Sequence, residues 1–353
     1  MTTTNKNRIY CFDLLKIISL VFVFTHHIVM DMYVTHPMHN LKIIEGLIIR
    51  PNLNLVMVAC GLFVLISGAT LAFNKREESP LSFYKRRLTR VLIPFYIAYL
   101  IYFIIKVISN KTIFIFGGIP KWRFIFTIMG IDEYLSANGI GTFSLGVGEW
   151  FLGCIILCYL VYPFLYRAHK KNRVLTFVIM TTYYIAFNLN YHKFNFTIVS
   201  HMNFLSQIYN FYLGILLVDE EVTSKIKEWF LIVTIPIVLF LYTHAILIPI
   251  PDNFKTTIAC IALVIAFYIY EKIFSRIDVI KKFCKVIAKI SLEIFLVHHF
   301  IIYQVDYMLN YRRLNGIMTL AVIIFDIVAT IIIALIVEKL SSKAQTFMNK
   351  RHN

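Results

Sequence analysis

Residues 12–34, FDLLKIISLVFVFTHHIVMDMYV, decide how the chain can fold. The stretch is long and apolar enough to span a bilayer, whose hydrocarbon core is crossed by about 20 helical residues. It nevertheless carries four ionisable side chains, Asp13, Lys16, His26 and His27. Such groups are costly inside a span and normally face the protein interior or a water-filled cavity. We therefore expect this span to present a polar face to the inside of a helical bundle.

The spacing of these groups places most of them on one side of the helix. Lys16 and His27 are eleven residues apart, which is almost three turns, so they share a face and lie about 16 Å apart along the axis. Asp13 precedes Lys16 by three residues and can form an ion pair with it on that face. His26 points about 100° away from His27. A hydrogen-bonded interior histidine with a snorkelling lysine would give the same pattern, so spacing alone leaves structure and function open.

The composition of the whole chain predicts a membrane protein. Of its 353 residues, 59% are hydrophobic and 15% are charged, whereas soluble globular chains have about 25% charged residues. No polar stretch is long enough to bury a core of its own. The fold class is therefore all-α and polytopic, a single domain over residues 1–353 with no appended soluble domain. We count about ten transmembrane helices, near residues 12–34, 54–73, 91–108, 148–166, 174–190, 201–218, 229–248, 255–274, 287–308 and 317–338.

The net charge of +16 is distributed as an orientation signal. Lysine and arginine gather in alternate connections, as at residues 85–90, 167–173 and 281–289, and are sparse in the connections between them. By the positive-inside rule, both termini are cytoplasmic and the long connection 109–147 faces outward. We expect no nucleic-acid partner, because the positive charge is accounted for by topology.

The six cysteines lie in or beside apolar segments. Their spacing matches neither a metal site nor a disulfide framework. We expect them to pack as small hydrophobic side chains, and we expect no metal site in the protein.

A basic loop precedes the third apolar segment. In FYKRRLTRVLIPF, residues 83–95, three arginines gather where the third span begins: Arg86, Arg87 and Arg90. Guanidinium groups bind phosphates bidentately, so this cluster could hold a phosphorylated ligand at the cytoplasmic face. Basic residues just inside a span are also ordinary topology anchors, and the charge pattern alone does not separate the two roles.

Glu149 and Trp150 stand at the outer end of the span that begins in GVGEWFLG, residues 146–153. Tryptophan is common at membrane interfaces. A carboxylate at this position could orient an imidazole or bind sugar hydroxyls, and it could equally be a solvated helix start.

The late span ISLEIFLVHHFII, residues 290–302, carries Glu293, His298 and His299. These groups lie at membrane depth, where ionisable side chains are normally kept for pairing or chemistry. Their spacing does not fix their partners.

Taken together, these stretches resemble the acyltransferase-3 family of bacterial integral-membrane O-acyltransferases. The first span matches that family's basic residue, ten intervening residues and histidine, with Lys16 where the family more often has Arg and with His27 as the histidine. Residues 63–68, FVLISG, resemble its FF-x-x-SG element, with Val64 in place of an aromatic residue and Ser67 as the serine. Residues 84–94, 149–152 and 295–298 resemble its basic loop, W-F-L stretch and YLxH element. The five elements occur in the family's order.

The resemblance implies a multi-pass enzyme of the bacterial plasma membrane. It would move an acyl group, most often acetyl, from cytoplasmic acyl-CoA to a hydroxyl of an extracytoplasmic or lipid-linked glycan. Acetyl-CoA would be a co-substrate, and no cofactor would be bound permanently. His27 could act as a general base or carry the acyl group itself, and both mechanisms stay open.

The residues and the resemblance together select the candidate site. The catalytic candidates are His27 and Glu149. The candidates for substrate and donor binding are Asp13, Lys16, His26, Ser67, Arg86, Arg87, Arg90, Trp150 and His298. The expected partners are acyl-CoA, the glycan or lipid-linked sugar acceptor and the lipid bilayer, and the oligomeric state, a homo-oligomer included, is left open.

Other classes of protein compete with this interpretation. A polysaccharide exporter, flippase or solute transporter would need a continuous polar path and would favour broken spans in paired positions, which the sequence does not show convincingly. A sensor or scaffold within a membrane glycan machine would leave the buried His27 and Lys16 without a role.

Overall fold

The computed structural model describes residues 8–30, 54–74, 78–309 and 316–350. These residues form α-helices, short 3₁₀ turns and connections, and no β-strand occurs among them, which confirms the all-α prediction. The longer helices are α1 (Tyr10–Met30), α3 (Leu55–Phe73), α4 (Pro80–Asn110), α7 (Glu149–Lys171), α8 (Arg173–Leu189), α9 (Phe204–Leu217), α11 (Leu231–His244), α12 (Asp252–Ile269), α14 (Asp278–Met308) and α15 (Gly316–Lys350). The short elements are η3 (Lys121–Arg123), α5 (Phe124–Ile128), α6 (Asp132–Ala137), η4 (Tyr191–Lys193), η5 (Ser200–Met202), α10 (Glu220–Thr223), η6 (Glu228–Phe230), η7 (Ala245–Leu247) and α13 (Glu271–Phe274).

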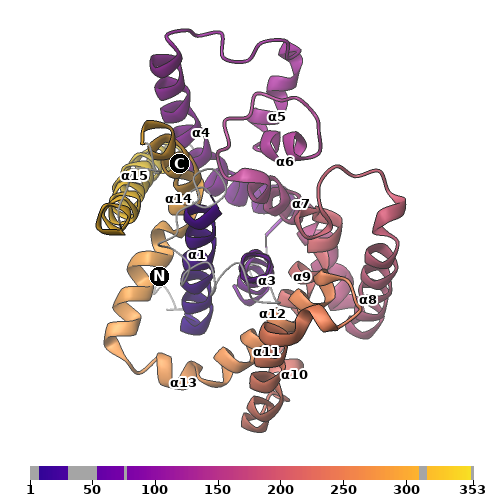
Figure 1. Ribbon diagram of the computed structural model, residues 1–353. Coiled ribbons are helices and arrows are strands. Elements are labelled where there is room, and N and C mark those ends of the chain that lie inside the picture. Colours follow the sequence, from indigo (N-terminus) through magenta and orange to yellow (C-terminus); the bar gives the residue numbers. More distant parts are fainter. Residues whose placement is uncertain (1–7, 31–53, 75–77, 310–315, 351–353) are drawn as a thin grey trace.

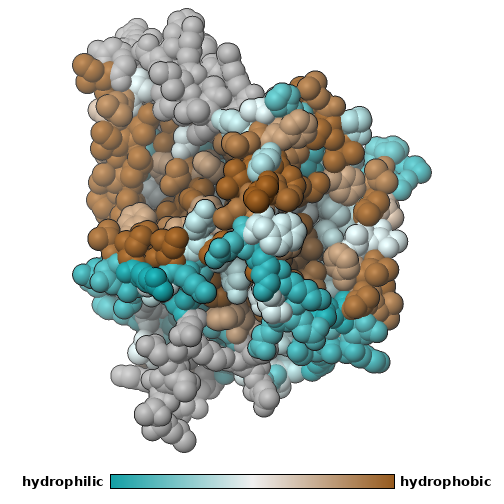
Figure 2. Space-filling model, turned by 90° about the horizontal axis from the view of Figure 1, so that it is seen from below, coloured by the Kyte–Doolittle hydropathy of each residue, from teal (hydrophilic) through white to brown (hydrophobic). Residues whose placement is uncertain are grey.

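Eight segments of the described chain are long and apolar enough to cross a membrane. The shorter apolar helices α8 and α9 have 17 and 14 residues, fewer than the about 20 that a bilayer core requires. Each of the ten predicted segments overlaps a helix. Eight of them are confirmed as long and apolar enough to span a membrane, and ten complete spans are not confirmed. Residues 31–34, the end of the first predicted segment, lie outside the described residues. Figure 2, seen from below the view of Figure 1, shows broad hydrophobic surfaces. Hydrophilic residues form a band across the lower part of that view.

The connection predicted as a basic loop is helical. α4 begins at Pro80, so the arginine cluster at residues 83–95 lies on the first turns of this helix. Ser79 caps the helix by accepting a hydrogen bond from the backbone N–H of Ser82 at 3.2 Å. Proline at the first helical position has no N–H to leave unpaired and a φ angle suited to a helix. The arginines are therefore held on a rigid element rather than on a loop.

Helices α1 and α3 lie in the middle of the bundle, with α14 and α15 on one side and α8, α9 and α12 on the other (Figure 1). α3 and α9 cross closely because each has a glycine at the crossing. A Cβ atom on Gly68 would lie 2.1 Å from the carbonyl oxygen of Phe211, and one on Gly214 would lie 1.8 Å from that of Leu65. Small residues let membrane helices approach in this way.

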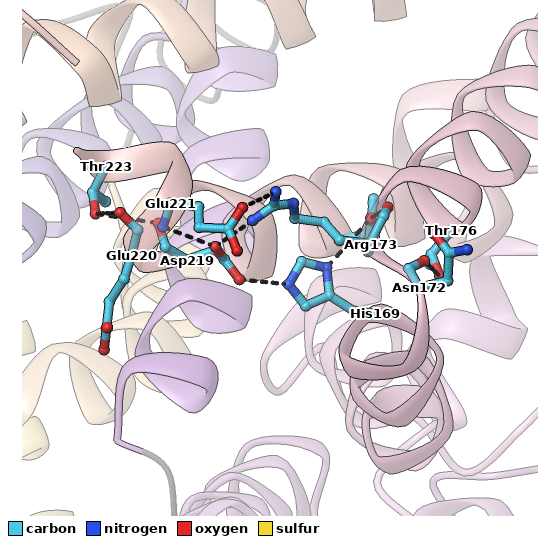
Figure 3. A network of polar contacts seen from close by, with 9 residues as sticks. His169, Asn172, Arg173, Thr176, Asp219, Glu220, Glu221 and Thr223 are labelled. Carbon is cyan, nitrogen blue, oxygen red and sulfur yellow. Dashed lines mark hydrogen bonds and ion pairs between the residues drawn. The ribbon is translucent and has the colours of Figure 1, made fainter. Parts of the chain in front are cut away.

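A polar cluster joins the adjacent ends of α7, α8 and α9 (Figure 3). Asp219, between α9 and α10, approaches His169 Nε2 at 3.2 Å and Arg173 Nη1 at 2.8 Å. Arg173 also pairs with Glu221. The cluster fixes the turn between α7 and α8 against α9, and it involves none of the predicted site residues.

The beginning of α1 is fixed by a carboxylate from a distant part of the chain. The backbone N–H groups of Tyr10 and Cys11 donate hydrogen bonds to Glu271 of α13 at 2.9 and 2.6 Å. These are among the helix N–H groups that have no partner within the helix itself. All six cysteines are buried and free, as expected for packing residues.

Candidate active site

Three helices bring one carboxylate and three imidazoles together. Glu149, the first residue of α7, places Oε1 3.1 Å from Nε2 of His27 on α1. The same oxygen lies 3.5 Å from Nε2 of His298 and 3.9 Å from Nδ1 of His299, both on α14. The Glu149 and His298 side chains are only 15% and 1% exposed, so imidazoles rather than water surround most of this carboxylate. We call His27, Glu149, His298 and His299 the histidine–glutamate centre.

A tight backbone turn carries Glu149 into this position. Gly148 and Glu149 have φ angles of +71° and +48°, in the left-handed region that residues with a Cβ atom rarely adopt. A Cβ atom on Gly148 would lie 2.9 Å from side-chain atoms of both Leu152 and Leu296, so only glycine fits there. Strained backbone of this kind is typical of functional sites, where the surrounding packing maintains it.

His298 is oriented by its own helix. Its Nδ1 atom lies 2.9 Å from the carbonyl oxygen of Phe295. A carbonyl oxygen only accepts, so Nδ1 carries the hydrogen and Nε2 faces Glu149. The His27 ring centroid is 5.1 Å from that of His298 and 4.5 Å from that of His299. The imidazoles of α14 therefore fix the position of His27 from the side while Glu149 faces it directly.

The arrangement suits proton transfer by His27. An imidazole that takes a proton becomes a cation, and a carboxylate 3.1 Å away stabilises that cation. The ligand atoms of His27, Glu149 and His298 also lie within 4.8 Å of one another, so the set could hold a metal ion. Two histidines and one carboxylate form a known zinc ligand set. The sequence predicts no metal here, and that expectation stays a prediction.

A cavity of about 800 Å³ lies beside the basic start of α4. Five of the predicted binding residues line it: Lys16, Ser67, Arg86, Arg87 and Arg90. Lys85 and Lys289 add two further cations that the sequence analysis did not select. These cations outnumber the two carboxylates that also line the cavity, Glu293 and Glu338, and those of α4 lie on its first turns. We call this space the donor cavity.

The arginines of the donor cavity differ in how they are held. Arg86 forms an ion pair with Glu78, and its Nε donates to that carboxylate at 3.1 Å. Arg87 has a buried Nε atom with no hydrogen-bond partner in the described part of the chain. A buried donor without a partner carries a free-energy cost, so Arg87 is the arginine best prepared to bind an anionic ligand. The Ser67 hydroxyl lies 3.0 Å from that of Tyr159.

Several predicted residues lie elsewhere. Asp13 pairs with Arg8, just before α1, and not with Lys16 as predicted. No carboxylate lies within ion-pair distance of Lys16 among the described residues, because the Arg8 side chain occupies the Asp13 carboxylate. Asp13 and His27 share α1 with Lys16 but are not among the residues that line the donor cavity.

Two other predicted residues border the histidine–glutamate centre. The His26 ring centroid lies 5.5 Å from that of His27, nearly perpendicular to it, and no ion-pair contact between His26 and Glu149 occurs in the described structure. Trp150 is buried, with its ring centroid 5.7 Å from that of Phe151. It supports the packing beside Glu149 and does not lie at an exposed interface, as tryptophan near a span end commonly does.

The aromatic residues around the site could not be recognised as site residues from the sequence. Phe63, Phe151 and Phe295 line the donor cavity, and an apolar residue in a membrane span is not distinguished by composition. His299 was noted for its depth, but its proximity to Glu149 depends on how α14 packs against α7.

The fold and the histidine–glutamate centre define a multi-pass membrane protein with a buried cluster of ionisable side chains. A family model described as an acyltransferase domain, Acyl_transf_3, matches residues 9–339. The chain therefore belongs to the acyltransferase-3 family, and it is an acyltransferase that transfers groups other than aminoacyl groups. No curated protein and no solved structure matches the chain.

Proposed function

We propose that the protein transfers an acyl group, most readily acetyl, from cytoplasmic acyl-CoA to a hydroxyl of an extracytoplasmic or lipid-linked glycan. The single observation that carries this proposal is the arrangement along α1. Lys16 lines a strongly cationic cavity, and His27 meets Glu149 about three turns further along the same helix. The proposed site of the phosphorylated donor and the proposed proton acceptor thus lie along one helix, α1.

The donor cavity suits the polyanionic end of acyl-CoA. Charge-assisted hydrogen bonds from arginine and lysine to phosphate are stronger than neutral ones, and a guanidinium can bind two phosphate oxygens at once. The volume of about 800 Å³ falls within the range of small-molecule and cofactor sites. In the proposed orientation the basic end of the bundle faces the cytoplasm, where acyl-CoA is present, and the positive-inside rule supports that orientation.

The histidine–glutamate centre supplies the chemistry in one of two ways. As general base, His27 takes the hydroxyl proton while the hydroxyl oxygen attacks the thioester carbonyl and the thiolate leaves. As nucleophile, an imidazole nitrogen of His27 first attacks the thioester carbonyl and the CoA thiolate leaves. The acceptor hydroxyl oxygen then attacks the acyl group on His27, its proton passes to the thiolate, and the imidazole is released. In both routes Glu149 stabilises positive charge on His27, and burial keeps water away from the thioester.

The test combines cells and purified protein. Surface and lipid-linked glycans from cells with and without the gene are compared by mass spectrometry for O-acyl groups. The purified protein in lipid nanodiscs is then incubated with radiolabelled acetyl-CoA and the glycan fraction of the deletion strain. We expect O-acyl groups to depend on the gene and label to pass to glycan. Unchanged glycans together with no acetyl-CoA-dependent transfer would overturn the proposal.

A glycan exporter or flippase remains the alternative function. It would move glycan between leaflets without consuming acyl-CoA. Gene-dependent glycan export with unaltered acylation would therefore favour it over an acyltransferase of glycans.

A further inference from the structure

Three phenylalanines from three different helices meet between the donor cavity and the histidine–glutamate centre. Phe63 lies on α3, Phe151 on α7 and Phe295 on α14. The ring centroids of Phe151 and Phe295 are 4.9 Å apart, and that of Phe63 lies 5.8 Å from Phe151 and 6.1 Å from Phe295. These distances are typical of rings in direct contact. We call the three residues the phenylalanine layer.

One side of the phenylalanine layer faces the donor cavity, since all three residues line it. The other side faces the histidine–glutamate centre. The Phe295 ring centroid is 5.5 Å from that of His298, and Phe151 follows Glu149 on the first turn of α7. His27, Glu149 and His298 are not among the residues that line the cavity. The rings therefore occupy the space between the donor's binding site and the catalytic groups.

We propose that the phenylalanine layer is a gate that selects the acyl group by its length, an inference that rests on the proposed function. An acyl thioester held in the donor cavity reaches His27 only if these rings turn aside. A two-carbon acetyl group needs a small displacement, whereas each further methylene must push against rings packed at the density of a protein interior. Overfilling such a space is unfavourable, so the layer discriminates against longer acyl groups.

The same layer also limits hydrolysis. The cationic end of the donor cavity admits water, whereas three apolar rings in contact offer water no hydrogen-bond partner on the way between them. Water at the histidine–glutamate centre would attack the thioester carbonyl, with loss of its proton to His27, and would give free carboxylic acid and the thiol. A closed layer keeps the thioester of a bound donor away from that water until the acyl group itself passes between the rings.

The first test enlarges the opening. Phe63→Ala, Phe295→Ala and the milder Phe63→Leu are compared with the wild type in nanodiscs, using acetyl-, butyryl- and hexanoyl-CoA. We expect the ratio of kcat/KM for hexanoyl-CoA to that for acetyl-CoA to rise by about tenfold or more in the alanine variants, since each further methylene gains from burial once space exists. Release of thiol from acetyl-CoA without acceptor should also increase.

The control is Phe187→Ala. This residue is a buried aromatic of α8 that contacts Tyr183 and Tyr191 and does not line the donor cavity. It loses a ring of the same size, so it corrects for general loosening of the fold and should leave the donor ratio unchanged. If the alanine variants do not fold, the same ratio measured on Phe63→Leu decides the question.

The outcomes separate the two proposals. A wild-type protein that transfers no acyl group from any of the three donors contradicts the proposed function itself. A wild-type protein that transfers acetyl while all phenylalanine variants keep its donor ratio and its rate of hydrolysis overturns the gate alone. A higher ratio in the phenylalanine variants, with no change in Phe187→Ala, supports it.

Discussion

Glu149 Oε1 lies 3.1 Å from His27 Nε2, although the two residues lie on different helices that are far apart in the sequence. His27 is in the last turn of α1, and Glu149 starts α7 after a left-handed turn. An acidic residue is favourable in the first turn of a helix, where the helix dipole is positive. The pair thus combines a carboxylate that is favourable at its helix start with an imidazole that the carboxylate would stabilise as a cation. It is the most direct basis for predictions about catalysis.

Replacing His27 with alanine should abolish acyl transfer. General-base help is typically worth about 10²–10⁴-fold, and a covalent role would be worth more. His26→Ala should have a milder effect, because no ion-pair contact joins His26 to Glu149 in the described structure. The measurement is the rate of transfer by purified protein at saturating donor. Wild-type rates from His27→Ala would require the catalytic assignment to be withdrawn.

Glu149→Gln should reduce kcat by about 100-fold or more while the size of the side chain is kept. The amide cannot stabilise a cationic His27, so the loss falls on charge that develops during the reaction. The KM for acyl-CoA should change little, because Glu149 does not line the donor cavity. A selective rise in KM would instead place Glu149 in donor binding.

The wild-type rate should also be insensitive to metal chelation. Loss of activity with a chelator and its recovery with zinc would identify His27, Glu149 and His298 as metal ligands instead of an acid–base group. In that case Glu149→Gln would also lower the metal content of the purified protein.

Replacing Arg87 and Arg90 together with glutamine should raise the KM for acyl-CoA by about tenfold or more. Hydrogen bonds to charged groups contribute about 1.5–3 kcal/mol each, and both side chains line the donor cavity. Lys170→Gln removes a positive charge from the exposed end of α7, outside the cavity, and serves as the control. An unchanged KM accompanied by altered accessibility of the termini would show that the arginines act only as topology anchors.

Gly214→Ala should destabilise the bundle by about 1–3 kcal/mol or more, the cost of overpacking a core. The new Cβ atom would lie 1.8 Å from a backbone oxygen of α3, so the helices would have to separate. Gly117→Ala is the matched control, because nothing lies within 4 Å of its added Cβ atom. Thermal unfolding in detergent measures both. Equal unfolding temperatures would show that α3 and α9 can shift without cost.

Glu133 on α6 should make stability fall as pH rises. Its burial, together with the charges of Asp132 and Glu149, raises the pKa of Glu133 from 4.5 to about 7. The folded protein therefore binds more protons than the unfolded chain between these pH values, so stability decreases from about pH 4.5 towards pH 7. Glu133→Gln should flatten the dependence of unfolding temperature on pH between about pH 4.5 and 7.

Burial also raises the pKa of Asp132 to about 6, so a smaller slope should remain in Glu133→Gln. Glu228→Gln, at an exposed glutamate, should keep the full wild-type dependence. A wild-type protein whose unfolding temperature is level over this range would contradict the assignment.

The sequence by itself determined the helical membrane fold and the identity of the main catalytic candidates. Runs of about 20 apolar residues can satisfy their backbone groups in lipid only as helices or closed barrels, and the apolar runs here have the length of helices. Periodicity placed Lys16 and His27 on one face, because helical spacing fixes relations within a single helix. The motif order, from the first span to the late histidines, was also sufficient to predict the family, which the match over residues 9–339 confirms.

Only the tertiary structure decided which groups meet. Helical spacing says nothing about contacts between helices, so the approach of His298 and His299 to Glu149 could not be predicted. The pairing of Asp13 with Arg8 was missed for another reason, because Arg8 lies just before α1, where helical spacing does not apply. The position of Glu149 depends on a left-handed turn that the packing of Leu152 and Leu296 permits only at a glycine. The phenylalanine layer could not be predicted from the sequence, for a different reason. In a chain that is 59% hydrophobic, a phenylalanine becomes distinctive only when three helices place it between a cavity and the histidine–glutamate centre.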